Sequence, residues 1–213
     1  MNRYLLTFYK KDNMRFISHL DLQTLFQRAL RRGNVNVAFS NGFNPHELMN
    51  IVQPLSLGYE STCELVEVDT MEPYDTQDLI ERLNLALPEG IKFFKCEETE
   101  RKNQSTSCNT ESAEYDVISI CGDIEKLKAD EFVNQEKVII LKRDKKTKKM
   151  VEKDVKDMVI SIIKDAEVLK LKVCCGSNKT VNPTNLLTAL YEFSGLEFKQ
   201  ETIRITRTAL NRA

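Results

Sequence analysis

The chain has 213 residues, of which 41% are hydrophobic and 30% charged, and its formal net charge is −1 at pH 7. This composition predicts folded domains rather than a disordered chain, and it excludes the strongly basic overall charge typical of many nucleic-acid-binding proteins. A nucleic-acid site would need local clustering. Residues 1–50 hold seven Lys or Arg and three acidic residues, a balance of +4, whereas residues 51–98 are strongly acidic. The first domain is therefore predicted to be electrically polarised.

The six cysteines, at positions 63, 96, 108, 121, 174 and 175, form no CxxC pair. We expect reduced thiols in a cytoplasmic protein, because disulfides are rare in that compartment. With this cysteine spacing and two histidines, we expect no zinc site and no cofactor bound by the chain itself. The apolar run at residues 4–9 is too short for a signal peptide, and no apolar stretch approaches about 18 residues, so no membrane span is predicted.

The first half of the chain predicts the order strand, helix, strand, strand, helix, strand, at residues 4–9, 18–33, 35–39, 63–68, 76–87 and 91–94. In the first helix, Ser18 with Asp21 three residues later resembles a capping box, and Gly33 is a typical residue at a helix C-terminus. Thr76 is the predicted N-cap of the second helix. The apolar stripe of the first helix consists of Leu22, Leu25, Phe26 and Ala29.

A polar segment at residues 99–113 has no large apolar side chain, and we interpret it as a linker. The second half predicts a strand, a helix, two strands, a helix and a strand, at residues 115–120, 124–132, 137–141, 168–174, 182–195 and 202–208. An insertion is expected near residues 151–163. Asn182 as N-cap and Pro183 in the first turn mark the start of the last helix.

The similar order of elements in the two halves predicts an α+β protein of two tandem ferredoxin-like (split βαβ) domains with mainly antiparallel sheets. The predicted domains are residues 1–98 and residues 114–213, joined by the linker at residues 99–113. The repeat is one of element order, and the residues themselves do not repeat.

Three arginines cluster near the end of the first helix. Arg28 and Arg32 are one turn apart, and Arg31 lies three residues after Arg28. Arg28 and Arg31 are predicted to point away from the apolar stripe, with Arg32 nearer its edge. Because guanidinium groups suit phosphate oxygens, this face is a candidate patch for phosphate or for an acidic partner. The alternative is a solvated helix face whose charge complements the helix dipole.

His19 begins the same helix, where the helix dipole disfavours a protonated imidazole and favours a bound anion. A neutral His19 could donate to a phosphate or act as a general base. The alternative is a histidine that is hydrogen-bonded within the fold. That alternative is favoured, because the spacing fixes no second catalytic group.

The loop from position 40 to position 46 is rich in residues that make unusual backbone or polar contacts. Gly42 permits a positive φ, and Pro45 stiffens the exit of the loop. Such a turn can bind an anion or a base through its backbone N–H groups. The alternative is a structural turn in which Phe43 fills the core. The candidate binding residues of the loop are Ser40, Asn41, Gly42, Asn44 and His46.

Two further patterns are interpreted as structural. The lysine run at residues 142–149 predicts a solvated hairpin tip, with an extended basic surface for nucleic acid as the alternative. The segment Cys174-Cys175-Gly176 predicts the end of a strand rather than a redox site, because no residue near it in sequence would lower a thiol pKa.

Several short motifs carry a resemblance to a known family, and they are Arg15-Phe16, Ser18-His19-Leu20-Asp21, Arg28-Ala29-Leu30-Arg31-Arg32, Ala38-Phe39-Ser40 and Gly42-Phe43-Asn44-Pro45-His46. Together they resemble the radical-SAM-linked protein family, which is defined around a domain of unknown function. The similarity is specific over residues 15–58. In the second half it rests on the Asn182-Pro183 helix start and on Arg207-Thr208. The chain departs from the pattern at Glu47, where a second proline is expected.

Members of this family are encoded beside, or fused to, a radical S-adenosylmethionine protein, often near genes for ribonucleases and ribosomal proteins. The resemblance therefore implies an accessory role in RNA or ribosome-related modification, with a radical S-adenosylmethionine protein as partner. The chain lacks the three-cysteine CxxxCxxC motif. Any iron–sulfur cluster would therefore belong to that partner.

The leading hypothesis is a non-catalytic module that presents transfer or ribosomal RNA to the radical enzyme. The arginines would contact the RNA backbone, and the loop would contact a base or the partner. The residues predicted to bind RNA or an anion are Arg15, Ser18, His19, Arg28, Arg31, Arg32, Ser40, Asn41, Gly42, Asn44 and His46.

Two other functions stay open. Tandem ferredoxin-like domains resemble the CRISPR repeat-processing endoribonucleases, so the chain could be a metal-independent endoribonuclease with His19 or His46 as general base. It could instead be a scaffold that only docks the radical enzyme, which the near-zero net charge suits. The order of preference places the non-enzymatic RNA module first.

Overall fold

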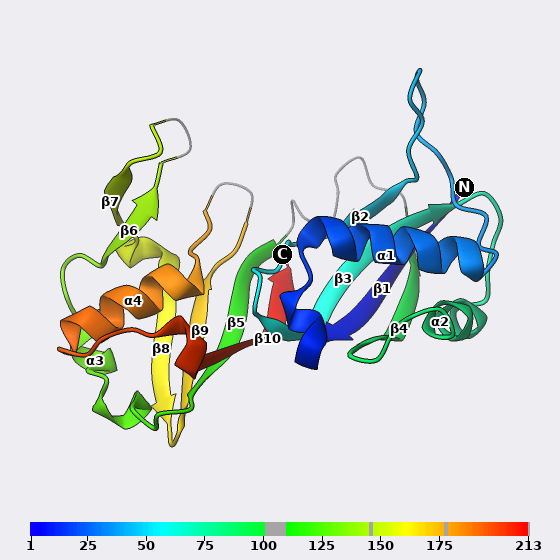
Figure 1. The fold of residues 1–213 in the computed structure, drawn as a ribbon. Coiled ribbons are helices and arrows are strands. Elements are labelled where there is room, and N and C mark those ends of the chain that lie inside the picture. Colours follow the sequence, from blue (N-terminus) through cyan, green and yellow to red (C-terminus); the bar gives the residue numbers. More distant parts are fainter. Residues whose placement is uncertain (101–109, 145–146, 177–178, 213) are drawn as a thin grey trace. The chain divides into compact units, whose positions relative to one another are not determined.

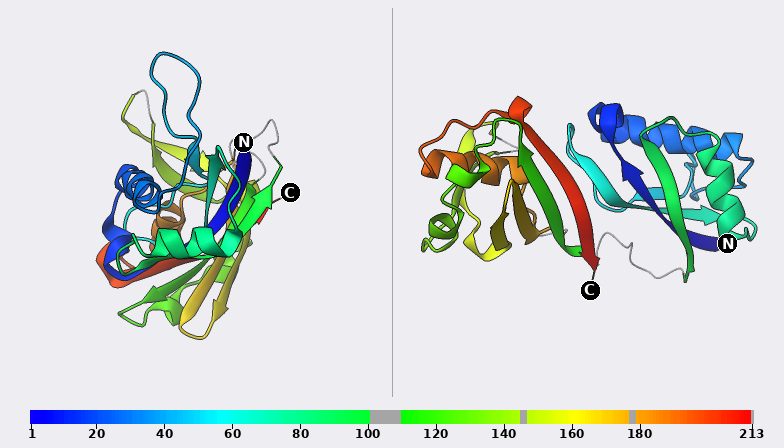
Figure 2. Two further views of the ribbon diagram at one scale, coloured as in Figure 1. Left: turned by 90° about the vertical axis from the view of Figure 1, so that its right-hand side faces the viewer. Right: turned by 90° about the horizontal axis from the view of Figure 1, so that it is seen from below.

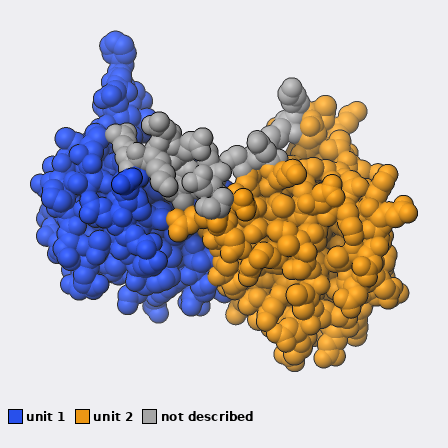
Figure 3. Space-filling model, turned by 180° about the vertical axis from the view of Figure 1, so that it is seen from behind, with its two compact units in different colours: residues 1–108 blue, residues 109–213 orange. Residues whose placement is uncertain are grey.

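The computed structural model describes residues 1–100, 110–144, 147–176 and 179–212. The chain divides into two compact units, Met1–Cys108 and Asn109–Ala213, which Figure 3 shows in different colours. Each unit combines helices with antiparallel strands, so the protein is α+β, as the sequence predicts. Within the described residues, no helix has both the length and the apolar character that crossing a membrane would require.

Unit 1 contains a four-stranded antiparallel sheet in which β1 lies between β4 and β3, and β2 pairs with the other side of β3. Helices α1 and α2 cover one face of this sheet (Figures 1 and 2). The described elements of unit 1 are β1 (Asn2–Lys10), the 3₁₀ helix η1 (Asp12–Phe16), α1 (His19–Arg32), β2 (Met49–Ile51), β3 (Glu60–Thr70), α2 (Thr76–Asn84) and β4 (Ile91–Thr99).

The core of unit 1 lies between this sheet and its two helices. Side chains alternate along β1, so Tyr4, Leu6 and Phe8 share one face and are fully buried. Phe26 of α1 packs against Phe8 and against Phe93 of β4, with ring centroids 4.8 Å and 5.1 Å apart. This aromatic cluster fixes α1 on the sheet, because large buried rings contribute much of the packing energy.

The capping signals predict the helix starts well, with one correction. The Ser18 hydroxyl oxygen accepts the Asp21 N–H at 3.2 Å and donates to the Asp21 carboxylate at 2.7 Å, which confirms the predicted capping pair. Gly33 is the C-cap of α1, as predicted. Asp75, rather than Thr76, caps α2: its carboxylate accepts two backbone N–H groups of the first turn, and a carboxylate is a stronger acceptor there than a hydroxyl.

The second predicted strand, at residues 35–39, is wrong. This segment forms only isolated bridges, Val37 with Thr70 and Phe39 with Glu47, and the sheet strand β2 begins ten residues later, at Met49. The chain touches the end of β3, leaves it to form a hairpin, and pairs regularly with β3 only on its return. The apolar residues Val35, Val37 and Ala38 are therefore buried without joining a regular strand.

Unit 2 contains the strand order β10-β5-β9-β8, with antiparallel neighbours, and a separate two-stranded ribbon made of β6 and β7. Its described elements are β5 (Thr110–Ser119), η3 (Ile124–Lys126), α3 (Ala129–Val133), β6 (Ile139–Arg143), β7 (Met150–Asp154), η4 (Lys156–Met158), β8 (Val159–Asp165), β9 (Val168–Cys174), α4 (Pro183–Phe193), η5 (Gln200–Thr202) and β10 (Ile203–Arg212).

Several predicted elements of unit 2 need correction. The strand expected at residues 137–141 belongs to the separate ribbon, and the expected insertion at 151–163 supplies the sheet strand β8, whose Ile162 is buried. The helix expected at 124–132 is two short helices, η3 and α3. Of the predicted linker, residues 101–109 lie outside the described chain, and residues 110–113 are part of β5. The prediction for α4 is confirmed, since Asn182 accepts the Thr184 N–H at 2.8 Å and Pro183 is the first helical residue.

Candidate functional site

A hairpin between α1 and β2 holds most of the loop residues singled out by the sequence. We call it the 39–47 hairpin, after the bridge between Phe39 and Glu47 that closes it. Below the bridge, the Leu48 N–H donates to the Ala38 carbonyl at 2.8 Å. The hairpin extends away from the body of unit 1, as the light-blue segment of Figure 1 and the blue projection of Figure 3 show.

Ser40 and His46 lock the two arms of the hairpin together. The Ser40 N–H donates to the His46 carbonyl at 2.8 Å, and the His46 N–H donates to Ser40 Oγ at 3.0 Å. Ser40 Oγ and His46 Nδ1 also lie 2.8 Å apart. When the hydroxyl donates to Nδ1, the neutral imidazole presents its Nε2–H for other contacts. Ser40 is thus a structural member of the site, and His46 keeps one ring nitrogen for a ligand.

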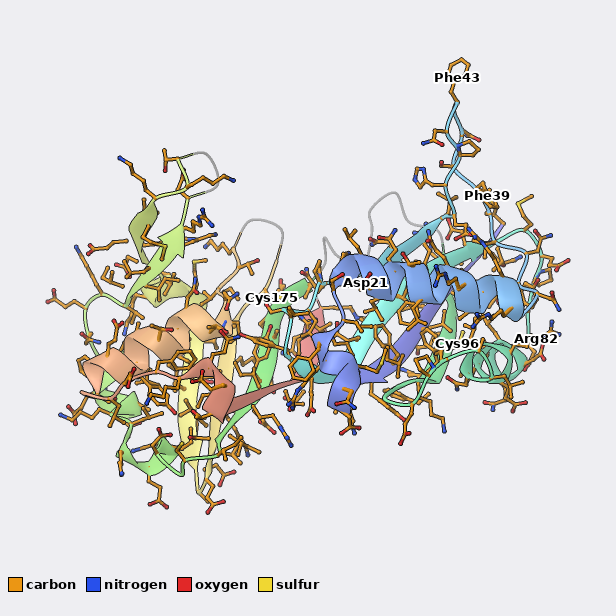
Figure 4. The ribbon with its side chains drawn as sticks, in the orientation of Figure 1. Asp21, Phe39, Phe43, Arg82, Cys96 and Cys175 are labelled. Carbon is orange, nitrogen blue, oxygen red and sulfur yellow. The ribbon has the colours of Figure 1, made fainter. Side chains whose placement is uncertain are left out.

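The tip of the hairpin exposes an aromatic ring. Phe43 is fully exposed and lies at the outer end of the hairpin, whereas Phe39, near the base, is half-exposed (Figure 4). The interpretation of Phe43 as a core residue is therefore wrong, because the arms pair with each other and carry the tip away from the core. Gly42 has a φ of +124°, a conformation that side chains rarely adopt, and it sets the turn. Asn41 and Asn44 beside it are exposed.

An ion pair ties the hairpin to α1. Arg31 Nε donates to Glu47 Oε1 at 2.8 Å; the Glu47 side chain is buried, while that of Arg31 is 68% exposed. The second oxygen, Glu47 Oε2, is buried and has no hydrogen-bond partner within the described residues. A buried carboxylate needs such a partner, because desolvating a charge is costly. Arg31 is therefore engaged in holding the hairpin.

Arg28 and Arg32 are exposed, and neither forms an ion pair with any residue that the structure describes. Successive residues of an α-helix are rotated by about 100°, so Arg28 lies between Arg31 and Arg32 around the helix. Arg31 reaches the hairpin, whereas Arg32 lines a groove that also includes Arg82 of α2. The three predicted arginines therefore fan over one side of α1, with two guanidinium groups available for an anion.

The remaining predicted residues lie at the other end of α1. Ser18 caps the helix, and Arg15 is 3.5 Å from Glu60 and stacks on the Phe16 ring at 4.6 Å. His19 is the first residue of α1, twelve residues before Arg31, which corresponds to about 18 Å along the helix. Arg15, Ser18 and His19 thus form no single site with the hairpin.

Among the residues that the structure describes, the predicted site residues form no assembled catalytic group. Ser40 and His46 are in contact, but both belong to the closure of an exposed hairpin, and no carboxylate is hydrogen-bonded to the ring within the described residues. Among those residues, no three His, Cys, Asp or Glu side chains cluster as metal ligands would. Burial, with smaller contributions from Glu97 and Asp75, raises the pKa of the Cys96 thiol to about 11, so this cysteine is a poor nucleophile.

Two lysines on the open face of the unit 2 sheet are ion-paired. Lys172 lies 2.9 Å from Glu114, and Lys170 lies 2.6 Å from Asp165. The hydrogen bond from Lys172 lowers the pKa of Glu114, and the hydrogen bond from Lys170 lowers that of Asp165. These two lysines are already ion-paired, so they offer a phosphate group less attraction than Arg28 and Arg32 of α1, which form no ion pair with a described residue, do.

Comparison with known proteins places the chain in a family. A family model described as an uncharacterized protein conserved in bacteria (DUF2344) matches residues 3–183. The chain belongs to this family. The DUF2344 match covers unit 1 from residue 3 onward, including α1 and the 39–47 hairpin, and reaches the first residue of α4 in unit 2. No curated protein matches the chain.

Sequence reasoning missed two residues of the site in this DUF2344 chain. Phe43 stands alone as a large apolar residue in a polar turn, a pattern that fits an exposed anchor as well as a core residue. Glu47 marks the departure from the expected proline, and the structure gives it a role, since it receives Arg31. The available signal for Glu47 was that it is the first acidic residue after the three arginines of the helix.

Proposed function

We propose that the chain is a non-catalytic accessory module that binds RNA through the 39–47 hairpin and the arginine face of α1. The proposal rests on the presence of two features in unit 1. One is the fully exposed ring of Phe43, and the other is two arginines, Arg28 and Arg32, that have no acidic partner within the described residues. Aromatic rings stack on unpaired bases, and arginines bind phosphate groups. Arg28 and Arg32 would contact the backbone while Phe43 contacts a base.

Contacts at the arms and at the base of the hairpin support its exposed tip. Its arms are closed by Ser40 and His46, and its base is tied to α1 by Arg31 and Glu47. A tip held in one conformation loses less entropy on binding than a flexible loop would. The exposed amides Asn41 and Asn44, and the free nitrogen of His46, would supply hydrogen bonds to the edge of a stacked base.

The partner in this proposal is a radical S-adenosylmethionine protein, and the RNA is transfer or ribosomal RNA. Both come from the resemblance of residues 15–58 to the radical-SAM-linked family. The cluster chemistry would belong to the partner, and the module would work in the cytoplasm without a cofactor of its own. We also propose that the two units are tandem ferredoxin-like domains. The strand orders β4-β1-β3-β2 and β10-β5-β9-β8 support it.

The test is fluorescence anisotropy with labelled transfer RNA and ribosomal RNA fragments at low and moderate salt. We expect the wild-type chain to bind, and R28E/R32E to lose at least tenfold in affinity, because two phosphate contacts become repulsive. The matched control is K11E/K92E, which makes the same charge change at two exposed lysines of the same unit that form no ion pair with a described residue. Affinity of the control should stay within about twofold of wild type.

Two outcomes would contradict the proposal. Absence of binding at low salt would remove RNA as the ligand and favour a docking scaffold, in which Phe43 would enter a pocket of a protein partner. Equal losses in R28E/R32E and K11E/K92E would show a non-specific charge effect. The RNA is also run on a gel afterwards: cleavage without metal, abolished by H19A or H46A, would instead support the endoribonuclease alternative.

A further inference from the structure

The β6–β7 ribbon is a hairpin of unit 2, and its position in the order of elements matches that of the 39–47 hairpin in unit 1. The 39–47 hairpin lies between α1 and the sheet strand β2. The ribbon lies between α3 and the sheet strand β8. Each unit therefore carries an extra hairpin in the connection that follows its first α-helix, and Figure 1 shows both.

The ribbon presents positive charge that has no acidic partner among the described residues. Four basic side chains at its end are exposed, and none forms an ion pair with a described residue. This contrasts with Lys170 and Lys172 on the sheet of the same unit, which are both ion-paired. The run continues in sequence through Lys145 and Lys146, which lie outside the described residues. The four exposed basic residues are Lys142, Arg143, Lys148 and Lys149.

The ribbon is an ordered structure up to its turn. β6 and β7 pair in continuous antiparallel register from Ile139–Asp154 to Arg143–Met150. At the turn, the Asp144 carboxylate accepts the Thr147 N–H at 2.6 Å and the Thr147 hydroxyl at 2.8 Å. The acid nearest the lysines is therefore held by the turn, and the cations are displayed on a defined scaffold.

Apolar side chains accompany the cations. Leu141, Met150 and Val151 are between 43% and 59% exposed on the same ribbon. A solvated hairpin tip needs no exposed apolar side chains beside its charges, whereas a surface that contacts nucleic acid uses both, with cations on phosphate groups and apolar groups against sugars and bases. The combination distinguishes the ribbon from an ordinary charged turn.

We propose that the β6–β7 ribbon is a second RNA contact, which binds the phosphate backbone while the 39–47 hairpin contacts an unpaired base. This inference rests on the proposed function and deepens it by naming the substrate class. A ring such as Phe43 can stack only on a base that is already out of a continuous helix. The expected ligand is therefore a structured RNA that combines backbone for the ribbon with an unpaired loop or bulge, such as a stem–loop.

The experiment measures the salt dependence of binding to a labelled RNA stem–loop for full-length K142Q/K149Q and for wild type. The matched control is K126Q/K128Q, which removes two exposed, unpaired lysines elsewhere in unit 2. Each lost phosphate contact lowers the slope of log K against log salt by about 0.7–0.9. We expect the ribbon variant to lose about 1.5 in slope and about tenfold in affinity at low salt, and the control to match wild type.

The outcomes separate this inference from the proposed function. If K142Q/K149Q keeps the wild-type slope while R28E/R32E still weakens binding, the ribbon contact is wrong and the RNA-binding function stands. If the wild-type chain does not bind the stem–loop, both fail. A further arm uses vesicles of phosphatidylcholine with phosphatidylserine. Binding to these vesicles that depends on Lys142 and Lys149, without RNA binding, would overturn the proposal and assign the ribbon to an anionic lipid surface. Equal affinity for a blunt duplex of the same length would overturn the unpaired-base requirement.

Discussion

In unit 1 the connection between α1 and β2 is a hairpin with an aromatic tip, and in unit 2 the connection between α3 and β8 is a ribbon with a cationic end. Phe43 is fully exposed at the first, and Lys142, Lys148 and Lys149 are exposed at the second. The same position in two similar element orders thus carries two kinds of chemistry. Connections after a helix tolerate insertions because they lie at the surface, where added residues disturb no core.

The two hairpins are also held in different ways. The 39–47 hairpin is tied to α1 by the Arg31–Glu47 ion pair, one member of which is exposed to solvent, in addition to the hydrogen bonds between its arms and the buried Ala38 at its base. The ribbon is rooted by Val138 and Ile140, which are buried in unit 2, and by the Val138 N–H, which donates to Asp154 Oδ1 at 3.1 Å. Apolar burial is insensitive to salt, whereas an exposed ion pair weakens as salt rises. The tie between the 39–47 hairpin and α1 is therefore expected to weaken under high salt, whereas the buried base of the ribbon is not.

Among the changes that test this difference between the two hairpins, Phe43→Ala is expected to have the largest effect, which is on RNA binding. Loss of a stacked ring should weaken binding of an RNA stem–loop by about 1–3 kcal/mol, with no change in the salt slope, because no charge is removed. Stability should stay within about 0.5 kcal/mol of wild type, since the ring is fully exposed. The matched control is Phe94→Ala, which removes a half-exposed ring from β4. A loss of affinity equal in the two variants would contradict the role of the hairpin tip.

The next effect concerns the tie between the hairpin and α1. Arg31→Ala should destabilise unit 1 by about 1–2 kcal/mol, because it leaves the buried Glu47 carboxylate without its charged donor; the exposure of Arg31 keeps the value below that of a fully buried pair. Arg28→Ala, on the same helix with no ion pair, is the control and should change stability by less than about 0.5 kcal/mol. Urea unfolding measures both.

Two results would contradict a stabilising role of the Arg31–Glu47 ion pair. Equal stability of the Arg31 and Arg28 variants would show that the ion pair contributes nothing. Full recovery is expected in Arg31→Ala/Glu47→Gln, because a neutral amide is less costly to bury than an unpaired carboxylate. If the double variant is no more stable than Arg31→Ala, the cost does not come from the buried charge.

The smallest expected effect is a difference in thiol reactivity between one cysteine of unit 1 and one of unit 2. Burial raises the pKa of Cys96 to about 11, above its ordinary value of 9.0, so at pH 8 its reactive thiolate is about a hundredfold rarer than for an ordinary thiol. Cys121 of unit 2 is exposed. Alkylation at pH 8, followed by mass spectrometry of the peptides, should modify Cys121 well before Cys96. Labelling of Cys96 should accelerate as pH rises towards 11, and early modification of Cys96 at pH 8 would contradict its burial.

The elements that could be predicted are those whose signals lie within a few residues. Ser18 and Asn182 identify their helix starts because a capping side chain bonds to the backbone two or three residues away. β9 has the predicted bounds, since its alternation of apolar and polar residues is local. The error at Thr76 is of one residue only, because Asp75 beside it is the better acceptor.

The elements that could not be predicted depend on partners far away in sequence. Residues 35–39 and 137–141 have strand-like composition, yet neither joins the main sheet of its unit, because backbone pairing is decided by which edge of the sheet is free. The same reason explains why β8 was not predicted as a strand of the main sheet. Apolar alternation indicates that a segment is buried, and it does not indicate which strand lies beside it.

By itself the sequence determined the α+β class, the capped helices and the location of the candidate site between positions 15 and 58. Those features follow from local hydrogen bonding and apolar periodicity. Only the tertiary structure decided which of those residues are free to bind. It placed Arg31 against Glu47, left Arg28 and Arg32 unpaired within the described chain, and excluded the alternative in which Phe43 fills the core by placing it at the tip of a hairpin. The physical reason is that exposure and ion pairing are properties of three-dimensional neighbours, and a lone Phe or Arg in a sequence carries no record of them.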